Sequence, residues 1–282
     1  MNTKQFIYLF ALVMLINSPL RAQIQMPQAS PPSKVSQLVG LTQVTLEYSR
    51  PSVRERKIFG ELVPFGQVWR TGANSATIIE FSTDVTVEGQ PLKAGKYAIY
   101  SIPEKNASTI VFSSKTDLWG AVGYSPSDDV LRVKATSKKL KRPIETLEIG
   151  FRDITDSGAS LFIDWEKVST LLRIESEVDP LVMNQIQAQV IDKTPDNPGI
   201  YFQAATYYFN TDRDLNLALD WVTKSVEADP KYWTVHLKAK IEQKLNLKEE
   251  AKASATKSMD MAKEANNLDY VGLNERLIKA LK

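Results

Sequence analysis

The sequence predicts a β + α protein of two domains, an antiparallel β-sandwich or jelly roll over residues 34–176 and a helical domain over residues 180–282. Between Ser36 and Ser176, apolar residues recur with a period of two, which is typical of strands with one face in water. From Asp179-Pro180 onward the period is 3.6, as in amphipathic helices. Because no helical segment interrupts the first part, we expect its strands to pair antiparallel.

The first 22 residues are predicted to form a signal peptide. Lys4 precedes an apolar run from Phe6 to Ile16, and Ala22 offers a cleavage site. A run of 11 residues is too short to span a bilayer, which takes about 20. We therefore expect a periplasmic or secreted protein without a membrane span; a buried N-terminal element and a retained anchor are the alternatives. Residues 23–33, polar and rich in proline, are expected to be an extended leader.

The composition excludes several classes of function. Signal removal takes away two of the 35 Lys and Arg residues and none of the 33 Asp and Glu residues, so the mature chain is formally neutral. Net charge thus gives no support for nucleic-acid binding. The absence of cysteine excludes disulfides and thiol chemistry. A single histidine, His236, leaves little for metal or acid–base chemistry, and we expect no cofactor and no metal.

The strands are expected to number about nine or ten, bounded by Gly, Pro, Asp and Ser. The segment Glu88–Pro91 is expected to be a turn. The alternating apolar sets, in chain order, are Val44/Leu46/Tyr48, Val85/Val87, Ile110/Phe112, Leu131/Val133, Leu147/Ile149/Phe151, Leu161/Ile163/Trp165 and Val168/Thr170/Leu172/Ile174.

The helices are placed by their expected first residues. Asp179 followed by Pro180 is expected to be an N-cap with proline at the first helical position, and Val182, Ile186 and Val190 lie on one face of that helix. Further helices are expected to open at Asn197-Pro198, at Asp214 or its neighbours, at Asp229-Pro230 and at Asn246, and a last one to span Leu268–Leu281.

Part of the helical domain resembles tetratricopeptide repeats. Tyr201, Ala204, Ala205 and Tyr208 fall on the small and large positions of a first helix. A shift of 33 residues superposes Ala218 on Ala251 and Ser225 on Ser258. Lys238 stands where a small residue is expected, so the second repeat is degenerate, and generic helical hairpins are the alternative. Such repeats commonly present a concave surface to a protein partner.

Residues 48–77, here called the arginine loop, combine arginine, tryptophan, glycine and asparagine in a way that core strands do not need. Guanidinium groups bind carboxylate, phosphate or sulfate. In the structural alternative, arginines pair with glutamates and fasten the loop to the sandwich. We expect that role for Arg50 and Arg70, and a ligand role at Arg54 or Arg56. The candidate ligand-binding residues are Arg50, Arg54, Arg56, Trp69, Arg70 and Asn74.

Two other groups of residues are weaker candidates. Trp69 and Trp119, together with three tyrosines, are candidates for a groove that binds sugar or peptide, with core packing as the alternative. A pair of glutamates is the second candidate, since hydrolases of carbohydrate use two carboxylates. The tyrosines are Tyr97, Tyr100 and Tyr124, and the glutamates are Glu61, Glu80 and Glu166.

Several unusual sequence segments occur in a recognisable order. They are Tyr48-Ser-Arg-Pro51, Arg56–Pro64, Trp69–Thr77 and Leu92–Pro103. Together they resemble a bacterial family catalogued as domain of unknown function 2911, over about residues 25–175. The resemblance implies a signal peptide and, in some members, a helical tail; it implies no activity and no catalytic residues.

The function predicted from these observations is that of an extracytoplasmic, non-catalytic binding or scaffold protein. Its helical repeats would bind a protein partner, and its arginine loop a small anionic or glycan ligand. The alternative is a carboxylate-dependent hydrolase that acts on envelope carbohydrate.

Overall fold

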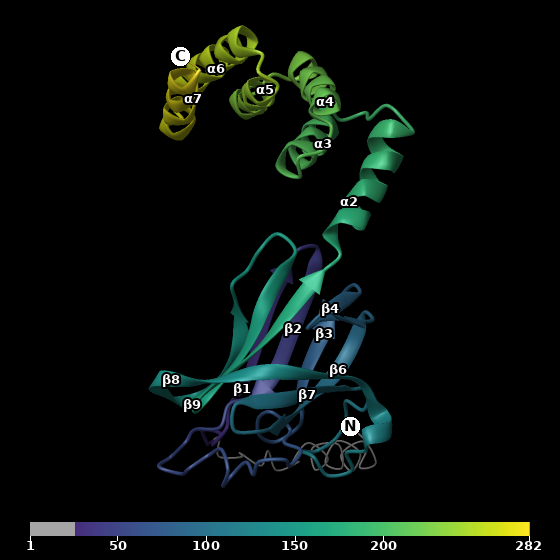
Figure 1. Cartoon of the computed structure of the whole chain (residues 1–282), viewed down its shortest axis with the longest axis vertical. Coiled ribbons are helices and arrows are strands. Elements are labelled where there is room, and N and C mark those ends of the chain that lie inside the picture. The colour runs from purple at the N-terminus through teal and green to yellow at the C-terminus, as the bar shows by residue number, and fades with distance from the viewer. Residues whose placement is uncertain (1–25, 282) are drawn as a thin grey trace, which may run out of the picture. The chain divides into compact units, whose positions relative to one another are not determined.

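A computed structural model describes residues 26–281, so the predicted signal peptide lies outside the described residues. The chain divides between Ser176 and Glu177 into two compact units, here called the β unit and the helical unit. All strands of the described residues belong to the first and all α-helices to the second (Figure 1). The predicted fold class, an antiparallel β domain followed by an all-α domain, is confirmed.

The β unit is built from one antiparallel sheet of nine strands, in the order β1-β2-β3-β6-β7-β8-β9-β4-β5. A short 3-10 turn, Pro126–Asp128, precedes β8. The strands are β1 Pro32–Val39, β2 Thr42–Ser49, β3 Thr77–Phe81, β4 Val85–Val87, β5 Gln90–Leu92, β6 Gly95–Pro103, β7 Ala107–Ser113, β8 Asp129–Arg152 and β9 Gly158–Ser176.

The two longest strands differ from the prediction. β8 has 24 residues and β9 has 19, and each joins segments that were expected to be separate strands. The pairing of β8 with β9 shifts register at Ile144, opposite Glu166, which has a φ of 52°. Beyond Glu166 the buried residues change from odd to even positions. A bulge bends a strand and breaks its alternation without ending its pairing, so the sequence pattern suggested two strands.

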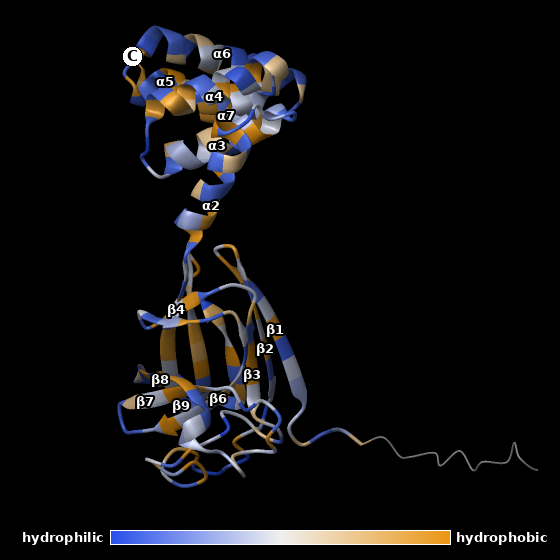
Figure 2. Ribbon diagram, turned by 90° about the vertical axis from the view of Figure 1, so that its right-hand side faces the viewer, coloured by the Kyte–Doolittle hydropathy of each residue, from blue (hydrophilic) through white to orange (hydrophobic). Residues whose placement is uncertain are grey.

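The sheet curls so that its two sides enclose one core. Ser52, three residues after the end of β2, forms a β-bridge with Thr146 of β8, although β2 and β8 are not neighbours in the sheet. The Thr42 hydroxyl donates to the Ser176 hydroxyl over 2.7 Å and joins β2 to the end of β9. Figure 2 shows the result in hydropathy: the inner faces of the strands are apolar, and polar residues lie on the outer face of β1 and β2.

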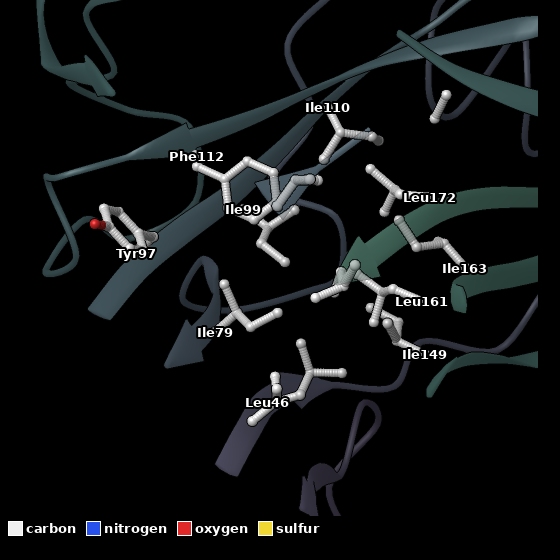
Figure 3. Packing of buried hydrophobic residues seen from close by; sticks show 14 of the residues in the cluster. Leu46, Ile79, Tyr97, Ile99, Ile110, Phe112, Ile149, Leu161, Ile163 and Leu172 are labelled. Carbon is white, nitrogen blue, oxygen red and sulfur yellow. The ribbon is translucent and has the colours of Figure 1, made fainter. Parts of the chain in front are cut away.

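Side chains from both sides of the curled sheet meet in this core (Figure 3). Leu46 and Ile79 come from the neighbouring strands β2 and β3, and Ile149 and Leu161 come from β8 and β9. All four are almost fully buried. Burying one such side chain contributes about 1.5–3 kcal/mol. The core therefore gives a stable frame on which long loops can be held.

The helical unit contains six α-helices among the described residues. The predicted caps Asn197 and Asp214 are confirmed, since each side chain accepts hydrogen bonds from the first turn of its helix. The helices are α2 Val178–Ile186, α3 Pro198–Asn210, α4 Leu215–Ala228, α5 Tyr232–Lys244, α6 Lys248–Glu264 and α7 Leu268–Ala280, and a π-helical turn at Gln187–Ile191 extends α2.

Three predicted helix starts are wrong, and the simplest case is Asn246, because α6 begins at Lys248 after the N-cap Leu247. Asp179 lies inside α2, whose N-cap is Glu177. Its carboxylate instead accepts hydrogen bonds from the Tyr207 hydroxyl and the Arg213 guanidinium, which hold α2 against α3 and its C-terminal turn. Asp229 is the C-cap of α4, and α5 starts later, after the N-cap Lys231. The Asp179 carboxylate is thus bound by residues distant in sequence. Asp229 belongs to the end of the preceding helix.

Consecutive helices pack against each other, as α3 on α4 and α5 on α6. Ala218, Ala251, Ser225 and Ser258, the small residues 33 positions apart, are all buried. Small side chains at these places allow close approach of two helices. The likeness to tetratricopeptide repeats stays a prediction. Within residues 26–281, the helices are all too short or too polar to cross a membrane.

Candidate functional site

The arginine loop lines a pocket of about 300 Å³, here called the anion pocket. Four of the six predicted ligand-binding residues line it: Arg54, Arg56, Trp69 and Arg70. Arg50 and Asn74 do not. The other lining residues are Ala29, Ser30, Pro51, Ser52, Leu62, Val63, Gly72, Ala73 and Trp165.

Backbone hydrogen bonds hold the arginine loop in place near both of its ends. Val53 donates to the Glu145 carbonyl over 2.7 Å, and Leu147 donates to the Pro51 carbonyl over 2.9 Å. Trp69 and Ser101 exchange two backbone hydrogen bonds of 2.8 Å each. The loop is therefore attached to β8 on one side and to β6 on the other, which positions its side chains with the rigidity of the sheet.

The three arginines of the anion pocket are oriented by backbone carbonyls. Arg56 donates to the Val53 carbonyl over 2.9 Å and to the Ser52 carbonyl over 2.6 Å. Arg70 donates from Nη1 to the Asn74 carbonyl over 2.9 Å, and Arg54 donates to a carbonyl of residue 29 over 3.3 Å. Within residues 26–281, none of the three forms an ion pair with a carboxylate.

Positive charge is therefore concentrated in the pocket. Its lining includes three guanidinium groups and, among the described residues, no carboxylate. A guanidinium has five N–H donors, and the carbonyls engage only one or two of them in each of these arginines. Donors that remain free beside a net positive charge favour a ligand with acidic oxygens.

Arg50 has a different environment. Its Nε donates to the carbonyl of Leu147 over 2.9 Å, and its Nη2 lies 3.3 Å from the carboxylate of Glu148. These contacts join the end of β2 to β8. Asn74 has a φ of 59°, and its amide donates to Ser49 Oγ over 3.3 Å. Arg50 thus fastens the loop, and Asn74 orients Arg70 through its carbonyl.

Two stacked indole rings form the aromatic part of the pocket. The ring centroids of Trp69 and Trp165 lie 5.6 Å apart with 18° between their planes, and Phe59 packs edge-on against both. Trp165 is only 2% exposed, and its indole N–H has no hydrogen-bond acceptor among the described residues. Trp165 was expected only as part of a core strand, so it is an addition to the predicted site. The break in apolar alternation directly after it, at Glu166-Lys167, was the available signal in the sequence.

The weaker candidates lie elsewhere. Tyr97 and Tyr100 are buried in the core, and the Tyr124 hydroxyl donates to the Asp129 carboxylate over 2.9 Å. Trp119, by contrast, is 66% exposed. The glutamates Glu61, Glu80 and Glu166 do not line the anion pocket. Within residues 26–281, no cluster of three or more His, Asp or Glu side chains has the geometry to hold a metal ion.

Comparison with known proteins gives one match. A family model described as a protein of unknown function, DUF2911, matches residues 30–174. Neither a curated protein nor a solved structure matches the chain.

Proposed function

The chain belongs to the DUF2911 family of proteins of unknown function, and we propose that it is an extracytoplasmic binding protein whose β unit takes up a small anionic ligand. The family description assigns no activity, so the proposal depends on the anion pocket. The location is proposed from the apolar run Phe6–Ile16 and its flanking residues.

The observation that carries the proposal is the set of three guanidinium groups around one pocket without a carboxylate partner among the described residues. Arg54 and Arg56 are exposed and Arg70 is half-buried, so a ligand in the pocket can reach all three guanidinium groups. Carbonyls orient Arg54, Arg56 and Arg70, but no carboxylate of the described residues pairs with these guanidinium groups to compensate their charge. The Glu145 carboxylate accepts a hydrogen bond from the backbone amide of Arg54 instead. An anion in the pocket would supply that compensation and relieve the repulsion between like charges.

Binding without turnover is the better supported form of this proposal. Catalysis by proton transfer needs a positioned acid or base near its working pKa, and the described lining of the pocket includes only arginines as ionisable groups. The hydrolase alternative has no observation in its favour, since its three candidate glutamates lie away from the pocket.

The protein partner of the helical unit stays a prediction. Its support is the buried register of small residues 33 positions apart, which matches the packing of stacked helical repeats.

Thermal melts with added anions test the proposal. Sulfate or phosphate should raise the melting temperature of the wild type, because a ligand at 100 times its Kd stabilises by about 2.7 kcal/mol. Arg56→Gln should lose most of this shift. Arg142→Gln, which removes an exposed arginine of β8 outside the pocket, should keep it. Chloride at equal ionic strength controls for screening. Equal shifts in wild type and Arg56→Gln would contradict the proposal.

A further inference from the structure

Trp119 is exposed on the surface of the β unit, one residue before Gly120, which lies against Arg70 of the anion pocket. It belongs to the connection between β7 and β8, residues 114–128, here called the Trp119 loop. Its neighbour Gly120 has a φ of 72° and lies against Arg70, since a Cβ at Gly120 would be only 2.5 Å from Arg70 Nη1. Arg70 therefore contacts the Trp119 loop and lines the anion pocket at the same time.

The Trp119 loop is attached to the β unit on both sides of the tryptophan. The Ala76 amide donates to the Leu118 carbonyl, and the Tyr100 hydroxyl donates to the Gly120 carbonyl, both over 3.4 Å. The backbone at Trp119 is thus held while 66% of the residue remains exposed. An exposed indole one residue away from a contact with Arg70 offers a flat apolar surface to a ligand that extends past that arginine.

We infer that the ligand is an acidic oligosaccharide, with a charged sugar in the anion pocket and the next sugar against the face of Trp119. This inference rests on the proposed function. A pocket of about 300 Å³ is at the small end of ligand sites and takes one sugar-sized group. Trp119 does not line this pocket, so a ligand that contacts both the pocket and the exposed indole is longer than one sugar.

The chemistry of the two sites matches that of an acidic sugar chain. The arginines bind a carboxylate or sulfate through paired N–H donors. The apolar face of a sugar ring packs on an indole ring, which is a flat surface of low hydration. Each ring of a polyuronate has both a carboxylate and an apolar face, so one chain can present a charged group to the pocket and an apolar ring face to the indole. Arg70 belongs to the cationic pocket and also contacts the loop that carries the exposed indole.

Calorimetric titration of the full-length mature protein tests the inference, with galacturonate, trigalacturonate and triglutamate as probes. In the wild type, trigalacturonate should bind about two- to tenfold more tightly than galacturonate, the size of gain expected from one aromatic contact. Trp119→Ala should remove that gain and leave galacturonate binding unchanged. Val122→Ala is the matched control, because Val122 lies in the same loop and is 80% exposed but has no ring.

The outcomes separate the inference from the proposed function. If galacturonate and trigalacturonate bind equally well and Trp119→Ala changes neither, the inference is wrong and the proposed function stands. If triglutamate binds as tightly as trigalacturonate and depends on Trp119 to the same extent, the sugar class is wrong. If no probe binds and sulfate gives no thermal shift, the proposed function fails as well. Unchanged melting temperatures of both variants confirm that they fold.

Discussion

The hydroxyl of Tyr48 accepts a hydrogen bond from the buried backbone amide of Ile149, with 2.9 Å between the two atoms. Tyr48 is in β2 and Ile149 is in β8, which are not neighbours in the sheet. The bond therefore joins two sides of the curled sheet. It also fixes the point at which the chain leaves β2 and enters the arginine loop, so the position of the anion pocket depends on it.

Tyr48→Phe should lower the stability of the β unit. The variant leaves the Ile149 amide buried without its acceptor, which costs about 1–3 kcal/mol. For a domain of this size the melting temperature should fall by about 2–4 °C for each kcal/mol. Tyr100→Phe is the control, because the hydroxyl of Tyr100 has only a long contact of 3.4 Å to the Gly120 carbonyl. Equal losses in the two variants would show that the Tyr48 bond contributes little.

Arg50 and Arg70 should respond differently to replacement by alanine. Arg50→Ala removes a charged donor to the carbonyl of the buried Leu147, at a cost of about 1–3 kcal/mol. Arg70→Ala removes one of three like charges and should change stability by less than about 0.5 kcal/mol, while weakening sulfate binding. Thermal melts of both variants with and without sulfate check this. A large loss of stability in Arg70→Ala without sulfate would assign it a structural role.

Gly120→Ala should weaken anion binding by displacing Arg70. The new Cβ would lie 2.5 Å from Arg70 Nη1, so the guanidinium has to move. Gly123→Ala is a matched control in the same loop: its φ of 82° imposes similar backbone strain, and its Cβ would meet only Leu118 at 3.4 Å. Both variants should lose about 1–2 kcal/mol of stability from the left-handed backbone. Only Gly120→Ala should raise the Kd for sulfate measured by calorimetry.

Glu242→Gln should stabilise the helical unit at neutral pH. Burial raises the pKa of the Glu242 carboxyl above its ordinary value, and a hydrogen bond with Ser254 and the charge of Lys238, with Nζ 3.8 Å away, offset this only in part. The folded state thus binds its proton more tightly than the unfolded state, and the stability from this group is lost as pH rises through the folded pKa. The neutral amide avoids that loss. In urea unfolding, the gain over wild type should be present at pH 7 and vanish near pH 4, and the exposed Glu227→Gln should show none.

His236 should make the helical unit less stable in mild acid. Its Nδ1 lies 2.7 Å from Asn274 Oδ1, and burial lowers the pKa of its imidazole below the ordinary 6.5, with Lys240 acting in the same direction. Its contribution is therefore complete above pH 6.5 and is lost as pH falls from there through the folded pKa. Since the chain has one histidine, His236→Gln should reduce the change of the urea unfolding midpoint between pH 5 and 7.5. Parallel pH profiles for the two proteins would contradict this.

Local pattern was enough to predict most of the elements. The alternation of Val44, Leu46 and Tyr48 matches their burial in β2, and Asn197 and Asp214 cap helices as expected. Each of these features depends on neighbours within a few residues, so the local sequence is enough to predict it. Asp179 is the counterexample, since its carboxylate could cap a helix but binds Arg213 of another segment instead.

The amino-acid sequence by itself determined the periodicities, and with them the change from strands to helices near Ser176, as well as the presence of an arginine-rich loop. Only the tertiary structure decided which arginines share a pocket. Arg50 and Arg70 look alike in sequence, yet one contacts β8 and the other lines the pocket with Trp165, which lies 95 positions further along the chain. Period and capping come from forces between near neighbours, whereas the partner of a guanidinium depends on how the sheet curls and on where the bulges in β8 and β9 bend it.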